Sequence, residues 1–146
     1  MATYQNLHTA ITLDSSGTLA DLQYFLTTAT TASADTAGPN TFGRTSVVAT
    51  RGGFCYGVIQ DNSTFTGFST KVAVLGVSKV AAGDTSAMEN AITYGTKLIS
   101  SSVGRAVPST AAVADYIFGV ALTPLATGAT ATITALINHI GTGSTN

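Results

Sequence analysis

The chain has 146 residues, of which 45% are hydrophobic and only 9% are charged, and its net charge is −1. This composition argues against a disordered protein, and the length has room for one domain of ordinary size or two very small ones. Its six Lys and Arg residues make no basic stripe for nucleic acid, and the scarcity of Glu and Lys argues against a helical bundle.

The first segment, residues 1–21, is polar and has little periodicity, so we expect an extended N-terminal arm there. This segment lacks the charged-then-apolar layout of a signal peptide. No apolar run in the chain approaches the roughly 20 residues that a membrane helix needs. We therefore expect a protein that contacts no membrane. The single cysteine, Cys55, cannot form an internal disulfide, so we expect synthesis in a reducing cytosol.

Residues 22–140 are predicted to form a single β domain. Short runs rich in Val, Ile, Phe, Tyr and Thr alternate with Gly, Pro, Asn and Asp, which is the pattern of strands and turns. The expected fold class is mainly β, a small β-barrel or β-sandwich. The expected strands are Leu22–Thr27, Ser46–Thr50, Phe54–Gln60, Thr70–Val77, Thr96–Ser100, Arg105–Val107, Tyr116–Leu122 and Thr130–Ile137.

Two other segments complete the predicted domain organisation. Asp84–Thr93 is the one candidate for a short helix, because Asp84 or Thr85 could cap it and four apolar residues would form a stripe. Residues 141–146 are polar and glycine-bearing, and are expected to be a flexible tail.

An internal repeat relates residues 43–76 to residues 104–137. A Gly-Arg pair, an aromatic-Gly-Val triplet, a further Gly and a hydrophobic strand recur at offsets of 61 or 62 residues. The triplets are Tyr56-Gly57-Val58 and Phe118-Gly119-Val120. We expect two three-strand modules packed face to face, with the glycine of each triplet at a bulge or a close backbone approach.

A search for chemistry finds no convergent site. His8 and His139, one near each terminus, are predicted to be ordinary polar residues, and Cys55 is predicted to be a buried, inert thiol. Asp61-Asn62-Ser63 and Arg51-Gly52-Gly53 are interpreted as turns rather than as a calcium loop or an RNA-binding segment. We expect no catalytic, cofactor-binding or metal-binding residues, and a protein that is not an enzyme.

The remaining profile is that of a structural or interaction protein whose 39 Ser and Thr residues outnumber its 13 charged residues. Segments 1–18 and 27–41 are expected to touch a partner or a neighbouring protomer. Aromatic residues are dense in the first half, and we expect some in the core and some in an inter-subunit contact. They are Phe42, Phe54, Tyr56, Phe65 and Phe68.

An ordered set of short motifs over residues 54–138 resembles the small decoration proteins of tailed-bacteriophage heads, the DUF2190-like capsid cement family. The matching motifs are Tyr56-Gly57-Val58, Val72-Ala73-Val74-Leu75-Gly76-Val77, Lys79-Val80-Ala81-Ala82-Gly83-Asp84, Ile92-Thr93-Tyr94-Gly95-Thr96-Lys97-Leu98, Gly104-Arg105-Ala106-Val107, Phe118-Gly119-Val120-Ala121-Leu122, Gly128 and Thr132-Ile133-Thr134-Ala135-Leu136. Residues 1–50 match less well.

The resemblance implies a β protein added to the outer surface of an expanded phage head. Proteins of this family commonly sit as trimers and clamp neighbouring major capsid subunits, so the implied partners are the major capsid protein and the chain itself. The implied location is the outer capsid surface of the virion, after synthesis in the host cytoplasm, and no cofactor is implied. The alternatives are another virion subunit (a head fibre base, tail-tube or spike component) or a carbohydrate-binding module, with an enzyme last.

Overall fold

The fold is taken from a computed structural model, which describes residues 8–15, 19–30, 44–47, 51–62, 64, 69–83, 90–110 and 115–142. The described part contains strands and no helix, so the predicted mainly-β class is confirmed. The strands are β1 (His8–Ser15), β2 (Leu26–Thr30), β3 (Arg44–Val47), β4 (Gly57–Ile59), β5 (Ser69–Ala82), β6 (Lys97–Ser100), β7 (Ala106–Pro108), β8 (Tyr116–Ala121) and β9 (Ala131–Thr142).

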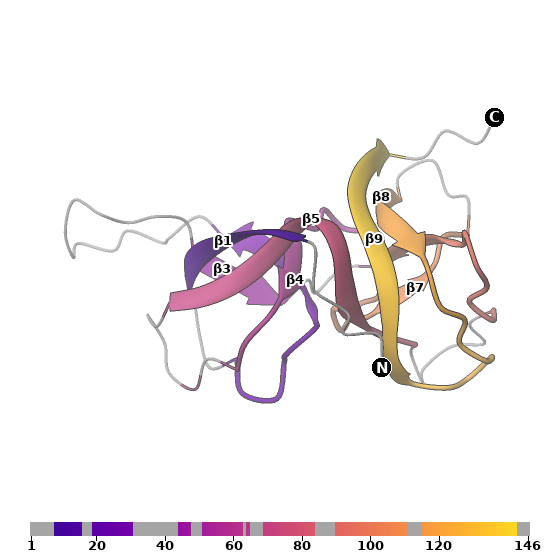
Figure 1. Cartoon of the computed structure of the whole chain (residues 1–146), viewed down its shortest axis with the longest axis horizontal. Helices are drawn as coiled ribbons and strands as arrows, with labels where there is room; N and C mark the ends of the chain where they lie inside the picture. The colour runs from indigo at the N-terminus through magenta and orange to yellow at the C-terminus, as the bar shows by residue number, and fades with distance from the viewer. Residues whose placement is uncertain are drawn as a thin grey trace, which may run out of the picture.

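Strand pairing closes two five-stranded rings that share β5. The first ring runs β1-β3-β2-β4-β5 and returns to β1, and the second runs β5-β7-β6-β8-β9 and returns to β5. Figure 1 shows the two groups of strands on either side of β5, which crosses the middle of the molecule. Strand β5 is long enough for both, since its 14 residues pair with β1 and β4 in one half and with β9 in the other.

Neither ring is a regular barrel, because one pairing in each is very short. Strands β1 and β3 pair in parallel over two residue pairs. Strands β5 and β7 meet at the single pair of Ala82 with Ala106. The other neighbours within the two rings are all antiparallel. The expected β-barrel or β-sandwich is therefore realised as two small, irregularly closed rings.

The internal repeat is present in the topology and is larger than the sequence indicates. The strand order β3-β2-β4-β5 of the first half is repeated as β7-β6-β8-β9 in the second, with antiparallel pairs throughout. Each module thus has four strands instead of the expected three. The extra strand is β2 in the first module and β6 in the second. The predicted strand Thr96–Ser100 matches β6, whereas the predicted strand Leu22–Thr27 shares only Leu26 and Thr27 with β2.

The main difference from the predicted elements lies at the N-terminus. Residues 8–15 of the predicted arm form β1, which is antiparallel to β5 from His8 opposite Gly76 to Asp14 opposite Ser69. At the other end, Gly141 and Thr142 of the predicted tail belong to β9. Of the candidate helix, residues 84–89 lie outside the described part, while 90–93 are not helical and Ile92 forms a bridge with Leu125.

One apolar core joins the two rings. The larger cluster of buried residues contains Val58 and Ala73 from the first ring and Leu98 and Phe118 from the second. Backbone hydrogen bonds also cross between the halves: the Leu26 N–H donates to the Gly104 carbonyl at 2.7 Å. Because buried side chains from both modules interdigitate, the rings form a single packed unit.

Candidate docking groove

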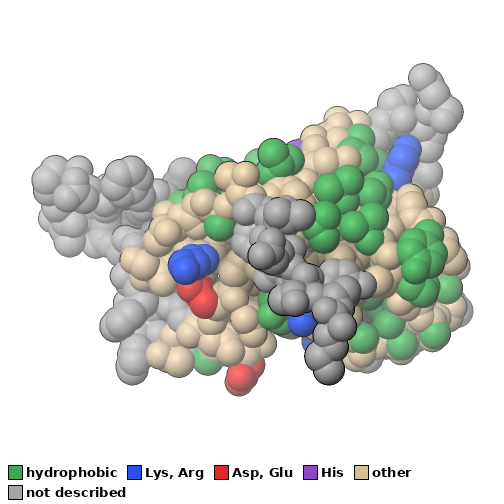
Figure 2. Space-filling view, in the orientation of Figure 1, with side chains coloured by type: hydrophobic (Ala, Val, Ile, Leu, Met, Phe, Trp, Pro, Cys, Tyr) green, Lys and Arg blue, Asp and Glu red, His purple; other side chains and the backbone are tan. Residues whose placement is uncertain are grey.

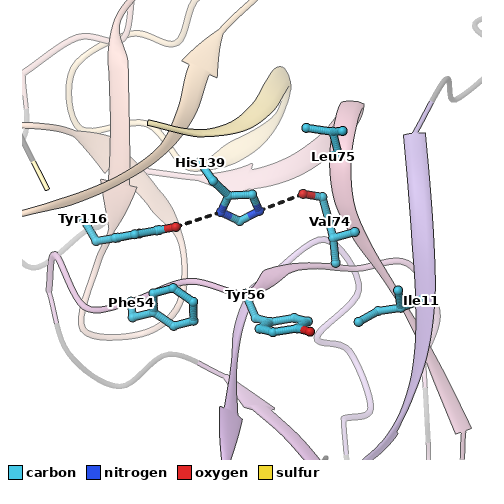
Figure 3. Close-up of a pocket in the computed structure, with 7 residues that line it drawn as sticks. All are labelled: Ile11, Phe54, Tyr56, Val74, Leu75, Tyr116 and His139. Atoms are coloured by element: carbon cyan, nitrogen blue, oxygen red, sulfur yellow. Dashed lines mark hydrogen bonds between the residues drawn. The ribbon is translucent and has the colours of Figure 1, made fainter. Parts of the chain in front are cut away.

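An open apolar groove of about 400 Å³ lies where the two rings diverge. Figure 3 shows its side chains arranged around the hollow, with rings from one side and aliphatic groups from the other. Its walls come from β1, β5, β8, β9 and the segment before β4. The lining residues are Ile11, Phe54, Tyr56, Val74, Leu75, Tyr116 and His139.

The groove exists because β5 changes its neighbour at this point. Strand β4 pairs with residues 72–73 of β5, and β9 begins to pair only at Gly76. Val74 and Leu75 lie between these two pairings. On the side of β1 the ladder is also irregular, since Thr9 faces Leu75 while Ala10 faces Ala73, so that Val74 is skipped. A β-bulge of this kind bends the strand and leaves its extra residue without a ladder partner.

A second bulge, in β9, places His139 over this gap. Ile117 faces Gly141 and Gly119 faces Ile137, so Phe118 of β8 lies opposite three residues of β9, 138–140. His139 has a left-handed backbone, with φ of 45°. This conformation is uncommon outside glycine, although Asn, Asp and His adopt it more often than other residues. The bend lets the imidazole reach the bulge in β5.

The imidazole closes the gap with two hydrogen bonds. Its Nε2 lies 2.7 Å from the Val74 carbonyl oxygen, and its Nδ1 lies 3.1 Å from the Tyr116 hydroxyl (Figure 3). Because a carbonyl oxygen only accepts, Nε2 must carry a proton and donate it. In the neutral ring Nδ1 then accepts from the Tyr116 hydroxyl. His139 therefore links β5, β8 and β9 and donates to the carbonyl of Val74, the residue that the register of β1 with β5 skips.

Three aromatic rings form one wall of the groove. The Phe54 and Tyr116 ring centroids are 4.8 Å apart and tilted, and Phe54 meets Tyr56 edge-on at 6.4 Å. Such tilted and edge-to-face pairs are the favoured aromatic geometries. Burial, with a smaller contribution from nearby Cys55, raises the pKa of Tyr116, so its hydroxyl keeps its proton and remains a hydrogen-bond donor.

The site offers apolar contact and little else. None of its seven lining residues is Asp, Glu, Lys or Arg. The polar atoms of His139 and Tyr116 are already bonded to one another and to Val74. On the face in Figure 2, charged side chains are few and scattered, and hydrophobic side chains gather over the half that carries β7, β8 and β9. The arrangement can therefore hold an apolar group.

The structure places the residues singled out in the sequence as follows. Phe54, Tyr56 and His139 come together in the groove, whereas Phe42, Phe65 and Phe68 lie outside the described residues. His8 begins β1, and its side chain is likewise not described.

Asp61 and Gly52 belong to the two segments that were interpreted as turns. Both carboxylate oxygens of Asp61 accept from the Lys71 N–H, at 3.1 and 3.2 Å. Gly52, at the turn before the aromatic segment, has φ of 64°. Among the residues that the structure describes, no three of His, Cys, Asp and Glu are grouped so as to hold a metal ion.

The buried cysteine carries no reactive character. Cys55 has no solvent exposure, and its sulfur lies 3.2 Å from the Gly57 carbonyl oxygen. Burial raises the pKa of its thiol from 9.0 to about 12, against smaller lowering contributions from hydrogen bonds. Because the thiolate is the nucleophilic form, this thiol is unreactive at neutral pH.

Sequence reasoning missed four lining residues: Ile11, Val74, Leu75 and Tyr116. Ile11 was assigned to the arm, and the other three were read only as strand residues. One signal was available in part, since Val74 and Leu75 are adjacent large apolar residues where a regular half-buried strand would alternate. In the structure Val74 is partly covered, and 52% of Leu75 is exposed.

Within the part of the chain that the structure describes, no helix is long and apolar enough to span a membrane.

Comparison with known proteins finds a structural likeness and no sequence family. No family model and no curated protein matches the chain, so membership of the capsid cement family stays a prediction. Among solved structures, the chain is similar to the head fiber gp8.5 N base of bacteriophage phi29, with a TM-score of 0.60 and 18% sequence identity. The match covers 94% of this chain and 100% of that one. At this identity the likeness establishes a shared fold.

Proposed function

We propose that this chain is a structural protein of a bacteriophage virion, bound to the outside of the head. The observation that carries the proposal is the likeness in fold to a phage head fibre base over nearly the whole of both chains. The low charge, the apolar groove and the motif resemblance to capsid cement proteins support the same class. The protein acts by binding and without catalysis.

In its finer form, the proposal is a decoration protein that clamps neighbouring major capsid subunits on an expanded head. The chain works as a homotrimer, its partners are the major capsid protein and its own copies, and it contacts neither nucleic acid nor membrane. A weakly charged surface suits packing against another protein surface. Repetition of the contact over many capsid positions gives strong total attachment even where each single contact is weak.

A second candidate is the base of a head fibre, which the structural likeness to the phi29 protein favours directly. A fibre base also binds the outer head surface but carries an elongated attachment. The decoration protein and the fibre base differ in the number of copies per head and in their effect on the head's stability. A decoration protein must occupy many sites and must raise the head's resistance to heat or pressure. A fibre base needs neither many sites nor a stabilising effect.

The test is co-sedimentation of the purified protein with heads of the phage whose genome encodes it, before and after expansion. The decoration proposal predicts saturable binding to expanded heads alone, with the number of bound copies close to the number of major capsid subunits. It also predicts that the heads release their DNA at a higher temperature. Binding to a small number of sites with no gain in head stability would assign the fibre-base role. Absence of binding to both head forms would overturn both.

A further inference from the structure

The groove is held open although its walls are apolar. Phe54 is 53% exposed and Leu75 is 52% exposed, on either side of the hollow. Contiguous exposed apolar groups of this kind mark interaction surfaces. The hydrogen bonds of His139 to Val74 and Tyr116 tie β5, β8 and β9 together beside the space, so the spacing of these strands is fixed in the free protein. A preorganised site of this kind loses little freedom on binding.

The chemistry of the lining decides among classes of partner. A nucleic acid or another anion would need cationic side chains, and the lining has none. A sugar could stack on Phe54, but its hydroxyls would find the His139 and Tyr116 groups already hydrogen-bonded, which leaves Tyr56 as the one remaining polar side chain of the lining. Burying hydroxyls without partners is unfavourable. Neutral apolar walls are complementary to a neutral apolar group.

The shape favours a group presented by a protein surface. A small apolar ligand is usually enclosed over most of its area. Here the half-exposed Phe54 and Leu75 leave one side of the groove open to solvent. A surface that carries a projecting aliphatic or aromatic side chain would fill the hollow and close this side at once. Central pockets that take one such anchor commonly dominate the energy of protein interfaces.

Resting on the proposed function, we propose that the groove is the contact with the phage head and takes one uncharged aliphatic or aromatic side chain of a capsid protein loop. The side chain lies between the Phe54–Tyr56 wall and Leu75. The lack of charge in the groove makes this contact insensitive to salt, unlike an electrostatic one. His139 is a positioning residue, since its two ring nitrogens are used in the hydrogen bonds to Val74 and Tyr116 that hold the walls.

The experiment compares head binding by Leu75→Asp with binding by Val103→Asp. Both side chains are about half exposed, 52% and 49%, but only Leu75 lines the groove. Circular dichroism and thermal melting establish that each variant is folded, and size-exclusion chromatography establishes that it keeps the oligomeric state of the unmodified chain. Loss of that state in Leu75→Asp would assign the groove to a contact between copies instead. Phe54→Ala provides a second change in the groove. We expect Leu75→Asp and Phe54→Ala to weaken binding to expanded heads at least ten-fold, and Val103→Asp to stay within two-fold of the unmodified chain.

The outcomes separate this inference from the function on which it rests. If the unmodified chain binds no heads, both are overturned. If it binds and folded Leu75→Asp binds equally well, the groove is not the contact while the head-binding function stands. Equal loss in Leu75→Asp and Val103→Asp would also overturn the assignment to the groove. Binding of the unmodified chain to an immobilised glycan that Phe54→Ala abolishes would assign the groove to a sugar instead.

Discussion

Gly57 and Gly119 hold equivalent positions in the two modules, each against a carbonyl of the next strand. A Cβ on Gly57 would stand less than 3.0 Å from the Ala73 carbonyl oxygen, and one on Gly119 equally close to that of Leu136. Neither glycine has a positive φ. The requirement is therefore steric: two backbones approach so closely that no side chain fits between them.

Replacing either glycine should destabilise the fold strongly. We expect Gly57→Ala and Gly119→Ala each to lower the free energy of unfolding by about 3 kcal/mol, since backbone must move to admit the new methyl group. Urea denaturation followed by circular dichroism measures this loss. Gly128→Ala is the matched control, because its Cβ would meet nothing within 4 Å and only its φ of 70° opposes the change. That strain costs about 1 kcal/mol, and equal losses at all three sites would refute the close-approach explanation.

The repeat was visible in the sequence because its landmarks are constrained by backbone geometry. Gly57 and Gly119 cannot vary freely, so the aromatic-Gly-Val triplet survives in both copies. Most strands could be predicted for a similar reason, since short β-branched runs end at turn residues. Closure of the rings could not, because the pairings of β1 with β3 and of β5 with β7 involve one or two residue pairs and leave no periodic trace.

The groove was predictable only in part. Phe54 and Tyr56 were two of the five aromatic residues expected either in the core or in an inter-subunit contact, but nothing local to the sequence reveals that β5 changes partners at Val74. His139 was predicted to be an ordinary polar residue near the C-terminus, whereas it lies within β9 and donates a hydrogen bond to the bulged residue of another strand. Such long-range pairing depends on register, which a single sequence does not specify.

Removing the imidazole of His139 should destabilise the protein where the two rings meet. His139→Ala leaves the Val74 carbonyl without its donor and removes a residue type that tolerates the left-handed backbone, so we expect a loss of about 2–3 kcal/mol in unfolding free energy. Tyr116→Phe, which deletes only the hydroxyl bonded to Nδ1, should cost about 1 kcal/mol. Urea denaturation measures both, and a larger loss in Tyr116→Phe would contradict the assigned roles.

The protonation state of His139 provides a direct check on the same geometry. Because Nε2 donates to a carbonyl, nitrogen-15 NMR of the protein with a neutral His139 ring should show the tautomer that carries its proton on Nε2. Tyr116→Phe should leave this tautomer unchanged, since the Val74 carbonyl still selects it. A neutral ring with its proton on Nδ1 would show that the bond to Val74 is absent in solution.

The shared strand and the common core predict that the two rings unfold together. Val58 and Ala73 of the first ring lie in the same buried cluster as Leu98 and Phe118 of the second. Hydrogen exchange should therefore give similar opening free energies for amides of β4 and β8, and urea unfolding should show one transition. A fragment of residues 84–146 lacks β5, so we expect it to remain unfolded. Two separate transitions, or a folded fragment, would refute the coupling.

The Cys55 thiol should make stability fall at alkaline pH. The unfolded chain loses this proton near pH 9.0, whereas burial keeps it on the folded chain until about pH 12. Between these values the unfolded state binds fewer protons, so the free energy of unfolding decreases as pH rises. From pH 8 to 10.5 the unmodified chain should lose about 2 kcal/mol more than Cys55→Ala, at about 1.4 kcal/mol per pH unit above 9. Urea denaturation of both chains at the two pH values measures the difference, in which the rise in the Tyr116 pKa that comes from its own burial cancels. Equal losses would mean that the thiol is reached by solvent, and rapid alkylation of Cys55 at pH 8 in the native protein would then be expected as well.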